Sequence, residues 1–178
     1  MIFVYPTDTA YAIGCDARDG ESIRKIFKIK RREESKILPL IASDIDMVSQ
    51  WCELSGLALK LAQKYWPGPL TLVLPVKKKG LSESVIQEGT IAIRVPDSEE
   101  ARGLSKEINA PIVSTSANKA GNPNCYSIES IKQSLGNSFK LIDRVIDKGE
   151  LTQREASTIA KYENGNIKII RQGDIKIK

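Results

Sequence analysis

Short apolar runs alternate with longer stretches of mixed polarity along this chain. The runs are rich in isoleucine, leucine and valine, which favours β-strands because strands are short and prefer β-branched residues. Seven strands are predicted in this way: Ile2–Tyr5, Leu38–Ala42, Leu70–Val76, Ile91–Val95, Ile112–Ser114, Leu141–Ile146 and Ile167–Arg171.

Helices are predicted between these runs, where a capping residue precedes an amphipathic stretch. The four candidates are a helix from Asp19 or Ser22 to about Lys30, one from Ser55 to Tyr65, one over Glu99–Ile108 after Asp97 or Ser98, and one over Ile128–Leu135 between Ser127 and Gly136. This alternation indicates an α/β protein in which helices pack on a twisted sheet of mixed strand direction. No repeat or linker divides the sequence, so we expect a single domain over residues 1–178.

The bulk composition is that of an ordinary globular protein, with 41% hydrophobic and 28% charged residues. No apolar run approaches the roughly 20 residues that a membrane-spanning helix needs. The first residues also lack the basic leader and long apolar core of a signal peptide. We therefore expect a cytoplasmic protein that has no membrane partner.

Histidine is absent from the sequence. This absence excludes Ser-His-Asp triads, Cys-His dyads, histidine general bases and the zinc sites that use histidine. The three cysteines are widely spaced and never form a CxxC pair, which argues against a disulfide framework and against a structural zinc site. Any catalysis must then rest on positioning, charge and hydroxyl groups, or on a bound magnesium ion.

The whole formal excess of positive charge, +5, lies in one window, Arg24–Lys36. Seven basic residues in this window meet only two acidic ones, Glu33 and Glu34. A cluster of this density favours an anionic partner, such as nucleotide phosphates, RNA or anionic lipid. The alternative interpretation is a solvated helix face rich in lysine, and charge alone does not decide between the two.

Three basic residues, Lys30, Arg32 and Lys36, close the predicted basic helix and lead into a strand. If the helix frays there, the three side chains project into one pocket, where a guanidinium fork and two point charges suit paired phosphate oxygens. The sequence has neither a G-x-x-x-x-G-K-[ST] loop nor a G-x-G-x-x-G loop. Phosphate binding would therefore depend on these cations rather than on a glycine-rich cradle.

Two segments concentrate hydroxyl groups next to predicted strands. Tyr5–Gly14 is interpreted as a loop that presents Thr7 and Thr9 either to a small polar ligand or to its own backbone in a local turn. Ser114–Asn118 is interpreted as a hydroxyl-rich turn after a buried strand, the edge at which open α/β sheets bind ligands. The alternative for this second segment is a helix cap or a turn.

Two arginines, Arg94 and Arg171, each stand at the end of an apolar strand. A charge in such a position is more often an anchor for another group than a surface decoration, since charged residues avoid apolar surroundings. Ser157 and Thr158 form a further hydroxyl pair at the start of a short apolar stretch. These positions are therefore additional candidates for ligand contacts.

Seven motifs occur in this order along the chain: Pro6–Gly14, Lys30-x-Arg32 with Lys36, Trp66–Thr71, Ile91–Pro96, Ser114–Asn118, Ser157-Thr158 and Arg171-x-Gly173. Together they resemble the YrdC family of threonylcarbamoyl-AMP synthases. Each motif alone is weak, but their common order and compatible spacing are specific, and they cover nearly the whole chain. The resemblance implies a YrdC-like α/β fold.

Enzymes of this family condense L-threonine, bicarbonate or carbon dioxide, and ATP into threonylcarbamoyl-AMP and pyrophosphate. The resemblance implies a nucleotidyltransferase whose product supplies the tRNA threonylcarbamoyltransferase proteins that make N6-threonylcarbamoyladenosine. No catalytic residue is expected, because the threonine amine adds to carbon dioxide unaided and the carbamate oxygen then attacks the α-phosphorus of ATP. Magnesium is expected to arrive with ATP, held by phosphate oxygens and water.

The resemblance also assigns roles to individual residues. For ATP it implies phosphate contacts from Lys30, Arg32, Lys36 and Arg171 and nucleotide contacts from Ser116 and Asn118. For the substrate threonine it implies Thr7, Thr9, Arg94, Thr115 and Ser157. Among these, Arg94 is expected to pair with the carboxylate of the substrate.

Several positions depart from the family pattern. Ala12 and Glu33 stand where the family commonly has glycine and proline, and Arg154–Thr158 lacks the usual glycine and proline before the Ser-Thr pair. The last departure bears on the threonine pocket around Ser157. The chain also begins at its first predicted strand, without the helix that relatives usually have ahead of it, and it resembles the minimal single-domain form.

Two other functions are compatible with the sequence. A non-catalytic RNA-binding module would use the Arg24–Lys36 surface, and its affinity for RNA would fall steeply with salt. A carbamoyl-transfer module is the second, but proteins of that kind carry further domains and zinc-binding cysteine pairs. This sequence shows neither.

Overall fold

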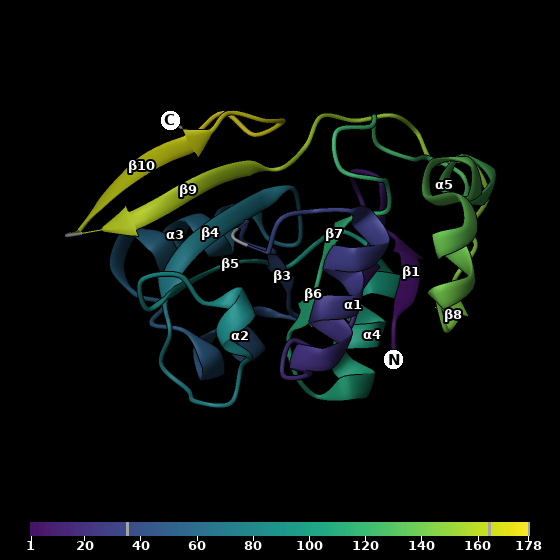
Figure 1. Ribbon diagram of the computed structural model, residues 1–178. Helices are drawn as coiled ribbons and strands as arrows, with labels where there is room; N and C mark the ends of the chain where they lie inside the picture. Colours follow the sequence, from purple (N-terminus) through teal and green to yellow (C-terminus); the bar gives the residue numbers. More distant parts are fainter. Residues whose placement is uncertain (35, 164, 178) are drawn as a thin grey trace.

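Two β-sheets of mixed strand direction form the centre of the computed structural model, which describes residues 1–34, 36–163 and 165–177 (Figure 1). The four-stranded sheet has the order β7-β2-β1-β8, formed by Thr115–Ser116, Tyr11–Gly14, Phe3–Pro6 and Arg144–Val145. The six-stranded sheet has the order β10-β9-β4-β5-β3-β6, formed by Asn166–Arg171, Thr158–Glu163, Leu70–Pro75, Thr90–Arg94, Leu40–Ile41 and Ile112–Val113. Each sheet combines parallel and antiparallel pairs.

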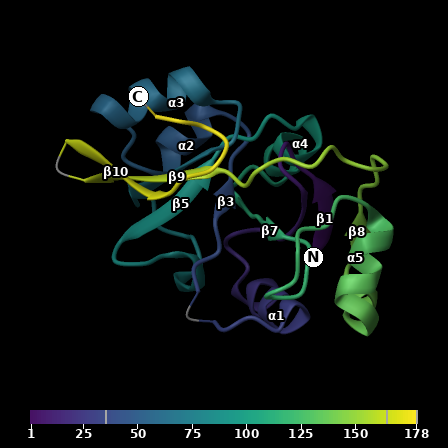
Figure 2. The same cartoon turned by 90° about the horizontal axis from the view of Figure 1, so that it is seen from above.

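Five α-helices and two 3₁₀-helices connect the described strands. They are α1 (Gly20–Lys30), α2 (Ile45–Trp51), α3 (Gly56–Tyr65), η1 (Glu83–Val85), α4 (Glu99–Ile108), α5 (Ile128–Leu135) and η2 (Gly136–Leu141). Figure 2 shows α2 and α3 on the side of the six-stranded sheet and α5 beside β8. The expected α/β class with helices on a mixed sheet is confirmed, although the strands form two sheets rather than one. The single domain over residues 1–178 stays a prediction.

The first helix, α1, shows how local sequence builds this fold. The carboxylate of Asp19 accepts hydrogen bonds from the backbone N–H groups of Glu21 (3.1 Å) and Ser22 (3.0 Å), which satisfies donors at the start of the helix. Ile23, Ile26 and Phe27 recur at helical spacing and are buried. Each such side chain stabilises the fold by about 1.5–3 kcal/mol. The packed face fixes how α1 lies against the core, and its end at Lys30 sets where the basic residues after it begin.

The segment Tyr5–Gly14, interpreted from the sequence as a loop, is instead a β-hairpin. Strands β1 and β2 pair in antiparallel register, with Tyr5 opposite Ala12 and Pro6 opposite Tyr11. The turn between them is closed by a 3.1 Å hydrogen bond from the N–H of Thr7 to the carbonyl of Ala10. Both strands are buried throughout, so they show none of the polar alternation by which a half-exposed strand is recognised.

The predicted hydroxyl-rich turn after the strand at Ile112 is a change of sheet. Strand β6 pairs with β3 in the six-stranded sheet, and after Ser114 the chain continues as β7, which pairs with β2 in the four-stranded sheet. Gly14 allows this close passage, because a Cβ atom there would lie 1.9 Å from the carbonyl oxygen of Val113. The two sheets therefore adjoin at Ser114, and this junction positions the site.

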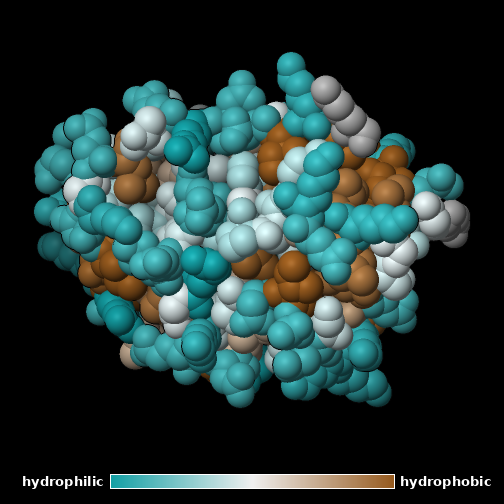
Figure 3. All heavy atoms as spheres, turned by 180° about the vertical axis from the view of Figure 1, so that it is seen from behind, coloured by the Kyte–Doolittle hydropathy of each residue, from teal (hydrophilic) through white to brown (hydrophobic). Residues whose placement is uncertain are grey.

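Other sequence expectations need correction at their edges. Of the predicted strand Leu141–Ile146 only β8 pairs, in parallel with β1, because the preceding residues form η2. Helix α2 and strand β9 were not predicted; α2 is only seven residues long and is capped by Asp44. Among the described helices, none has the length and apolar character required to cross a membrane. Seen from behind, hydrophobic residues reach the surface in separate patches among hydrophilic ones (Figure 3).

Candidate functional site

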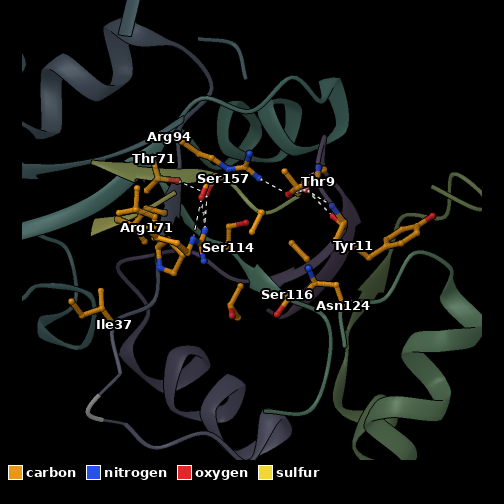
Figure 4. A pocket seen from close by; sticks show the side chains of 18 of the residues that line it. Thr9, Tyr11, Ile37, Thr71, Arg94, Ser114, Ser116, Asn124, Ser157 and Arg171 are labelled. Carbon is orange, nitrogen blue, oxygen red and sulfur yellow. Dashed lines mark hydrogen bonds between the residues drawn. The ribbon is translucent and has the colours of Figure 1, made fainter. Parts of the chain in front are cut away.

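A cavity of about 280 Å³ opens where the two sheets adjoin (Figure 4). Both sheets and the turns beside them contribute to its wall. The polar residues that line it are Thr7, Thr9, Tyr11, Arg32, Thr71, Arg94, Ser114, Thr115, Ser116, Asn124, Ser157 and Arg171. Among the described lining residues three carry guanidinium groups and none is acidic. The cavity is therefore suited to a small polar ligand that bears negative charge.

A second cavity of about 400 Å³ continues from the first and shares Arg32 and Ser116 with it. Its wall is the most cationic part of the site. It is lined by Lys30, Arg31, Arg32, Glu33, Lys36, Ser116, Asn118, Ala120 and Gly121. The structure thus brings together the three cations that sequence spacing placed in one pocket. It does so without fraying of the helix, because Arg31 adopts a left-handed conformation (φ 50°) that ends α1.

Lys30 turns inward and is only 1% exposed. Its Nζ donates hydrogen bonds to the carbonyl oxygen of Ser116, to the carbonyl oxygen of Asn118 (2.7 Å) and to Oδ1 of Asn118 (3.2 Å). Burial, together with the nearby charge of Arg32, lowers the pKa of Lys30 to about 7. Lys30 therefore supports the Ser116–Asn118 turn from behind while it lines the second cavity.

Arg32 stands at the boundary between the two cavities. One terminal nitrogen donates a 3.1 Å hydrogen bond to the carbonyl oxygen of Ile37, whereas its Nε is buried without a partner among the described residues. Burial lowers the pKa of this guanidinium from its ordinary value. A buried N–H without a partner is costly, and a bound anion would satisfy it.

Ser116 and Asn118, expected to contact the nucleotide, form a hydrogen-bonded turn. The hydroxyl of Ser116 donates to Oδ1 of Asn118 over 2.5 Å, and Nδ2 of Asn118 donates to the carbonyl oxygens of Asn122 and Pro123. The amide of Asn118 is therefore occupied by its own loop. Ser116 lines both cavities, and Thr115 in β7 is buried in the wall of the first.

The hydroxyl of Thr7 binds its own backbone in a local turn, which is one of the two alternatives that the sequence left open. Its hydroxyl donates to the carbonyl of Ala10 (2.7 Å) and accepts from the N–H groups of Thr9 and Ala10 (both 3.2 Å). The hydroxyl of Thr9 lies 3.1 Å from that of Thr7. A hydroxyl has a single proton, so Thr7 has little capacity left to donate to a ligand.

Arg94 is held by a residue that sequence reasoning did not assign to the site, Asp8. One terminal nitrogen of Arg94 lies 2.8 Å from Oδ1 of Asp8, and the other donates to the hydroxyl of Thr9 over 3.3 Å. The side chains of Arg94 and Asp8 are 9% and 2% exposed. The predicted partner of Arg94 was a substrate carboxylate, and in the structure a carboxylate of the protein already occupies part of its fork.

Ser157 and Arg171 lie together in another part of the cavity wall (Figure 4). The hydroxyl of Ser157 lies 2.8 Å from that of Thr71, and Arg171 donates to the carbonyl oxygen of Ser157 from Nε (3.1 Å) and a terminal nitrogen (2.7 Å). Partial burial and the charge of Arg94 lower the pKa of Arg171. This wall depends on Gly173, since a Cβ atom there would lie 2.0 Å from the carbonyl oxygen of Ala156.

Several lining residues were not predicted as ligand contacts. Thr71 and Tyr11 in the wall, and Asp8 behind it, lie inside motifs that the sequence analysis singled out, so a signal for them existed. Asn124 lies outside the seven motifs, and only the fold brings it to the cavity wall. The predicted cations Arg24, Lys25 and Lys28 are exposed on the outer face of α1, as the solvated-face interpretation expects.

Known proteins resemble this chain over most of its length. The model of the Sua5/YciO/YrdC family, described as "Telomere recombination", matches residues 1–173. A Methanocaldococcus jannaschii protein is 35% identical over 177 residues, covering 99% of this chain and 82% of its own length. An Idiomarina loihiensis protein named threonylcarbamoyl-AMP synthase is 35% identical over 150 residues, covering 83% of this chain and 79% of that protein.

Among solved structures, P. abyssi Sua5 complexed with L-threonine has a TM-score of 0.84 and 28% sequence identity. The match covers 97% of this chain and 50% of that protein, so the chain spans about half the length of that relative. The family model covers nearly the entire sequence, and both curated relatives exceed 30% identity. The chain is therefore a member of the Sua5/YciO/YrdC family.

Proposed function

We propose that this protein is a threonylcarbamoyl-AMP synthase, a nucleotidyltransferase that joins L-threonine, bicarbonate or carbon dioxide, and ATP. The observation that carries the proposal is the pair of adjoining cavities, one rich in hydroxyl groups and one rich in cations, with Arg32 shared between them. The cavity rich in hydroxyl groups suits a small amino acid, and the cavity rich in cations suits a polyphosphate. The name of the Idiomarina loihiensis relative and the threonine complex of P. abyssi Sua5 support it.

In this proposal the substrate threonine occupies the first cavity. Thr9, Arg94, Thr115 and Ser157 provide hydroxyl and guanidinium groups there, and Thr7 shapes the turn that carries Thr9. The ATP phosphates extend into the second cavity toward Lys30, Arg32 and Lys36, with Ser116 and Asn118 beside the nucleotide and Arg171 on the side of the first cavity. The α-phosphorus then lies near the boundary, within reach of Arg32.

The reaction needs alignment more than a protein nucleophile. The threonine amine adds to carbon dioxide, losing a proton, and the carbamate oxygen forms a bond to the α-phosphorus while the bond to pyrophosphate breaks. Held side by side, the two substrates react as if in one molecule. The guanidinium and ammonium groups of the second cavity stabilise the charge that develops on the leaving pyrophosphate. No side chain forms a covalent intermediate in this scheme.

Magnesium is proposed to enter as the complex of ATP. The second cavity offers cations, one hydroxyl and one amide, with Glu33 as its acidic lining residue. This donor set suits phosphate oxygens better than a hard cation, which prefers several oxygen ligands. Phosphate oxygens and water would therefore hold the ion and neutralise part of the ATP charge.

The proposed product is an unstable mixed anhydride, so it must pass to an acceptor soon after it forms. We place the reaction in the cytoplasm and name tRNA threonylcarbamoyltransferase proteins as the partners that receive the product. The alternative of a non-catalytic RNA-binding module is less well supported. Four of the seven cations in its basic window, Lys30, Arg31, Arg32 and Lys36, line the second cavity, and Lys30 among them is buried.

A pyrophosphate assay tests the proposal. Pyrophosphate should form only when ATP, L-threonine and bicarbonate are all supplied, and mass spectrometry should identify threonylcarbamoyl-AMP. L-valine is the matched control, because it has the shape of threonine without the hydroxyl group. Turnover of ATP that ignores threonine would contradict the synthase, and salt-sensitive RNA binding without nucleotide binding would favour the alternative.

A further inference from the structure

We propose that Asp8 is a positioning residue for amino-acid recognition, acting through Arg94; this inference rests on the proposed function. Asp8 lies in the turn between β1 and β2, whereas Arg94 ends β5 in the other sheet. Their 2.8 Å ion pair therefore joins the two sheets at the wall of the cavity. Arg94 lines that cavity and Asp8 does not, so the carboxylate supports the guanidinium from behind.

Further hydrogen bonds hold Asp8 and its turn in place. Its Oδ2 accepts a 3.3 Å hydrogen bond from the backbone N–H of Asp97, just before α4. The same turn is tied to α4 by the hydroxyl of Ser98, which donates to the carbonyl oxygen of Pro6 over 2.9 Å. With Thr9 accepting from the second terminal nitrogen, Arg94 is fixed at both ends of its fork. A fork held in this way presents its remaining N–H groups in one direction, which is the requirement for selective recognition.

Charge gives Asp8 a second effect. Arg32, Arg94 and Arg171 all line the same small cavity. Burial and the charge of Arg94 both lower the pKa of Arg171, as expected for two guanidinium groups that line one small cavity. Within the described part of the chain, Arg94 is the one of these three arginines that pairs with an acidic side chain, and that side chain is Asp8. Arg32 and Arg171 donate to backbone carbonyl oxygens instead. Without Asp8, a nearly buried guanidinium would lose its counter-charge and would move toward the substrate space or toward solvent.

Asp8→Asn is the decisive variant, because asparagine keeps the shape of the side chain and removes its charge. The KM for threonine should rise by about tenfold, with a smaller change in the KM for ATP and in kcat. Asp8→Glu, which restores the charge, should recover part of the loss. Glu107→Gln is the matched control: it removes a carboxylate paired with Arg144 at 3.2 Å on the exposed surface, and its kinetics should match the wild type.

A double-mutant cycle separates positioning from general stability. If Asp8 acts through Arg94, the threonine KM of the Asp8→Asn/Arg94→Ala double variant should equal that of Arg94→Ala alone. An unchanged threonine KM in Asp8→Asn, or effects that multiply in the double variant, would overturn the inference. A crystal structure of Asp8→Asn gives a test independent of activity, since an unmoved Arg94 would also contradict it. Lack of threonine-dependent turnover in the wild type would instead refute the proposed function.

Discussion

The ammonium group of Lys30 donates a 2.7 Å hydrogen bond to the carbonyl oxygen of Asn118, joining the end of α1 to the turn that follows β7. Two motifs that lie 88 residues apart in sequence thereby form one wall of the second cavity. Lys30 is nearly inaccessible and its three acceptors all come from Ser116 and Asn118. The lysine therefore shapes the proposed phosphate site as well as contributing charge to it.

The proposed ATP site should weaken as pH rises, because the pKa of Lys30 is about 7 in the ligand-free protein. Above this pH the amine is neutral, and binding of phosphate, which favours the ammonium, must take up a proton. The KM for ATP should therefore rise with pH above about 7 and level off once phosphate-bound Lys30 also loses its proton.

Steady-state kinetics from pH 6 to 9 measure this effect. Lys30→Met should have a higher KM for ATP at pH 6 and should lose the Lys30-dependent part of the rise, whereas the titration of ATP itself is common to both proteins. Lys28→Met changes an exposed lysine on the outer face of α1 and should keep the wild-type profile. An identical rise in wild type and Lys30→Met would show that Lys30 does not titrate in this range.

Local sequence predicted the parts of the site that depend on short-range order. The cap at Asp19 and the short spacing of Lys30, Arg32 and Lys36 are local features, and the structure places these three cations in one cavity at and beyond the end of α1. The Arg94–Asp8 and Thr71–Ser157 contacts each join residues 86 positions apart. The Arg94–Asp8 contact depends on how the two sheets meet, and the Thr71–Ser157 contact depends on the pairing of β4 with β9. Nothing in any one of these segments alone specifies its partner.

Buried strands were the other source of error. β2 has four buried residues in succession, and no pattern of polar positions distinguishes such a segment from a loop. The interpretation of Tyr5–Gly14 as a loop therefore failed at β2, and it holds only for the turn that the Thr7–Ala10 hydrogen bond closes. Asn124 has a different cause, because it is an exposed residue between β7 and α5 and only the fold brings it to the cavity wall.

Thr7 should matter for stability more than for direct substrate contact. Thr7→Val keeps the shape of the side chain but removes the hydroxyl that satisfies the carbonyl of Ala10 and the N–H groups of Thr9 and Ala10. Groups left unsatisfied in a buried turn cost about 1–3 kcal/mol of unfolding free energy. Urea denaturation measures this loss.

Two further variants serve as controls for Thr7→Val. Thr7→Ser retains the hydroxyl and should keep both stability and turnover close to the wild type. Thr152→Val removes the hydroxyl of an exposed threonine and should leave stability unchanged. If Thr7→Val unfolds like the wild type yet loses threonine binding, the hydroxyl serves the substrate directly and the turn role is wrong.

Arg32 should carry more of the reaction than any other cation of the basic window, because it lines both cavities and has a buried Nε without a described partner. Arg32→Ala should raise the KM for ATP and lower kcat, a combined loss of about 2–4 kcal/mol of transition-state stabilisation. Arg24→Ala removes an exposed guanidinium from the same helix and should change neither constant. Equal losses in the two variants would mean that total charge, rather than position, determines ATP binding.

Two glycine substitutions test whether the Ser157 wall requires close backbone packing. In Gly173→Ala the new Cβ would lie 2.0 Å from the carbonyl oxygen of Ala156 and 2.7 Å from the carbonyl carbon of Ser157, so the backbone must shift. This shift should separate Arg171 from Ser157, lowering both the melting temperature and the affinity for ATP.

Gly103→Ala is the matched change in α4, where a Cβ meets nothing within 4 Å. It should raise stability by about 0.5–1 kcal/mol, because alanine favours a helix over glycine. Calorimetric melting and ATP titration of both variants measure the contrast, and a Gly173→Ala protein as stable and as active as the wild type would show that the wall does not require this contact.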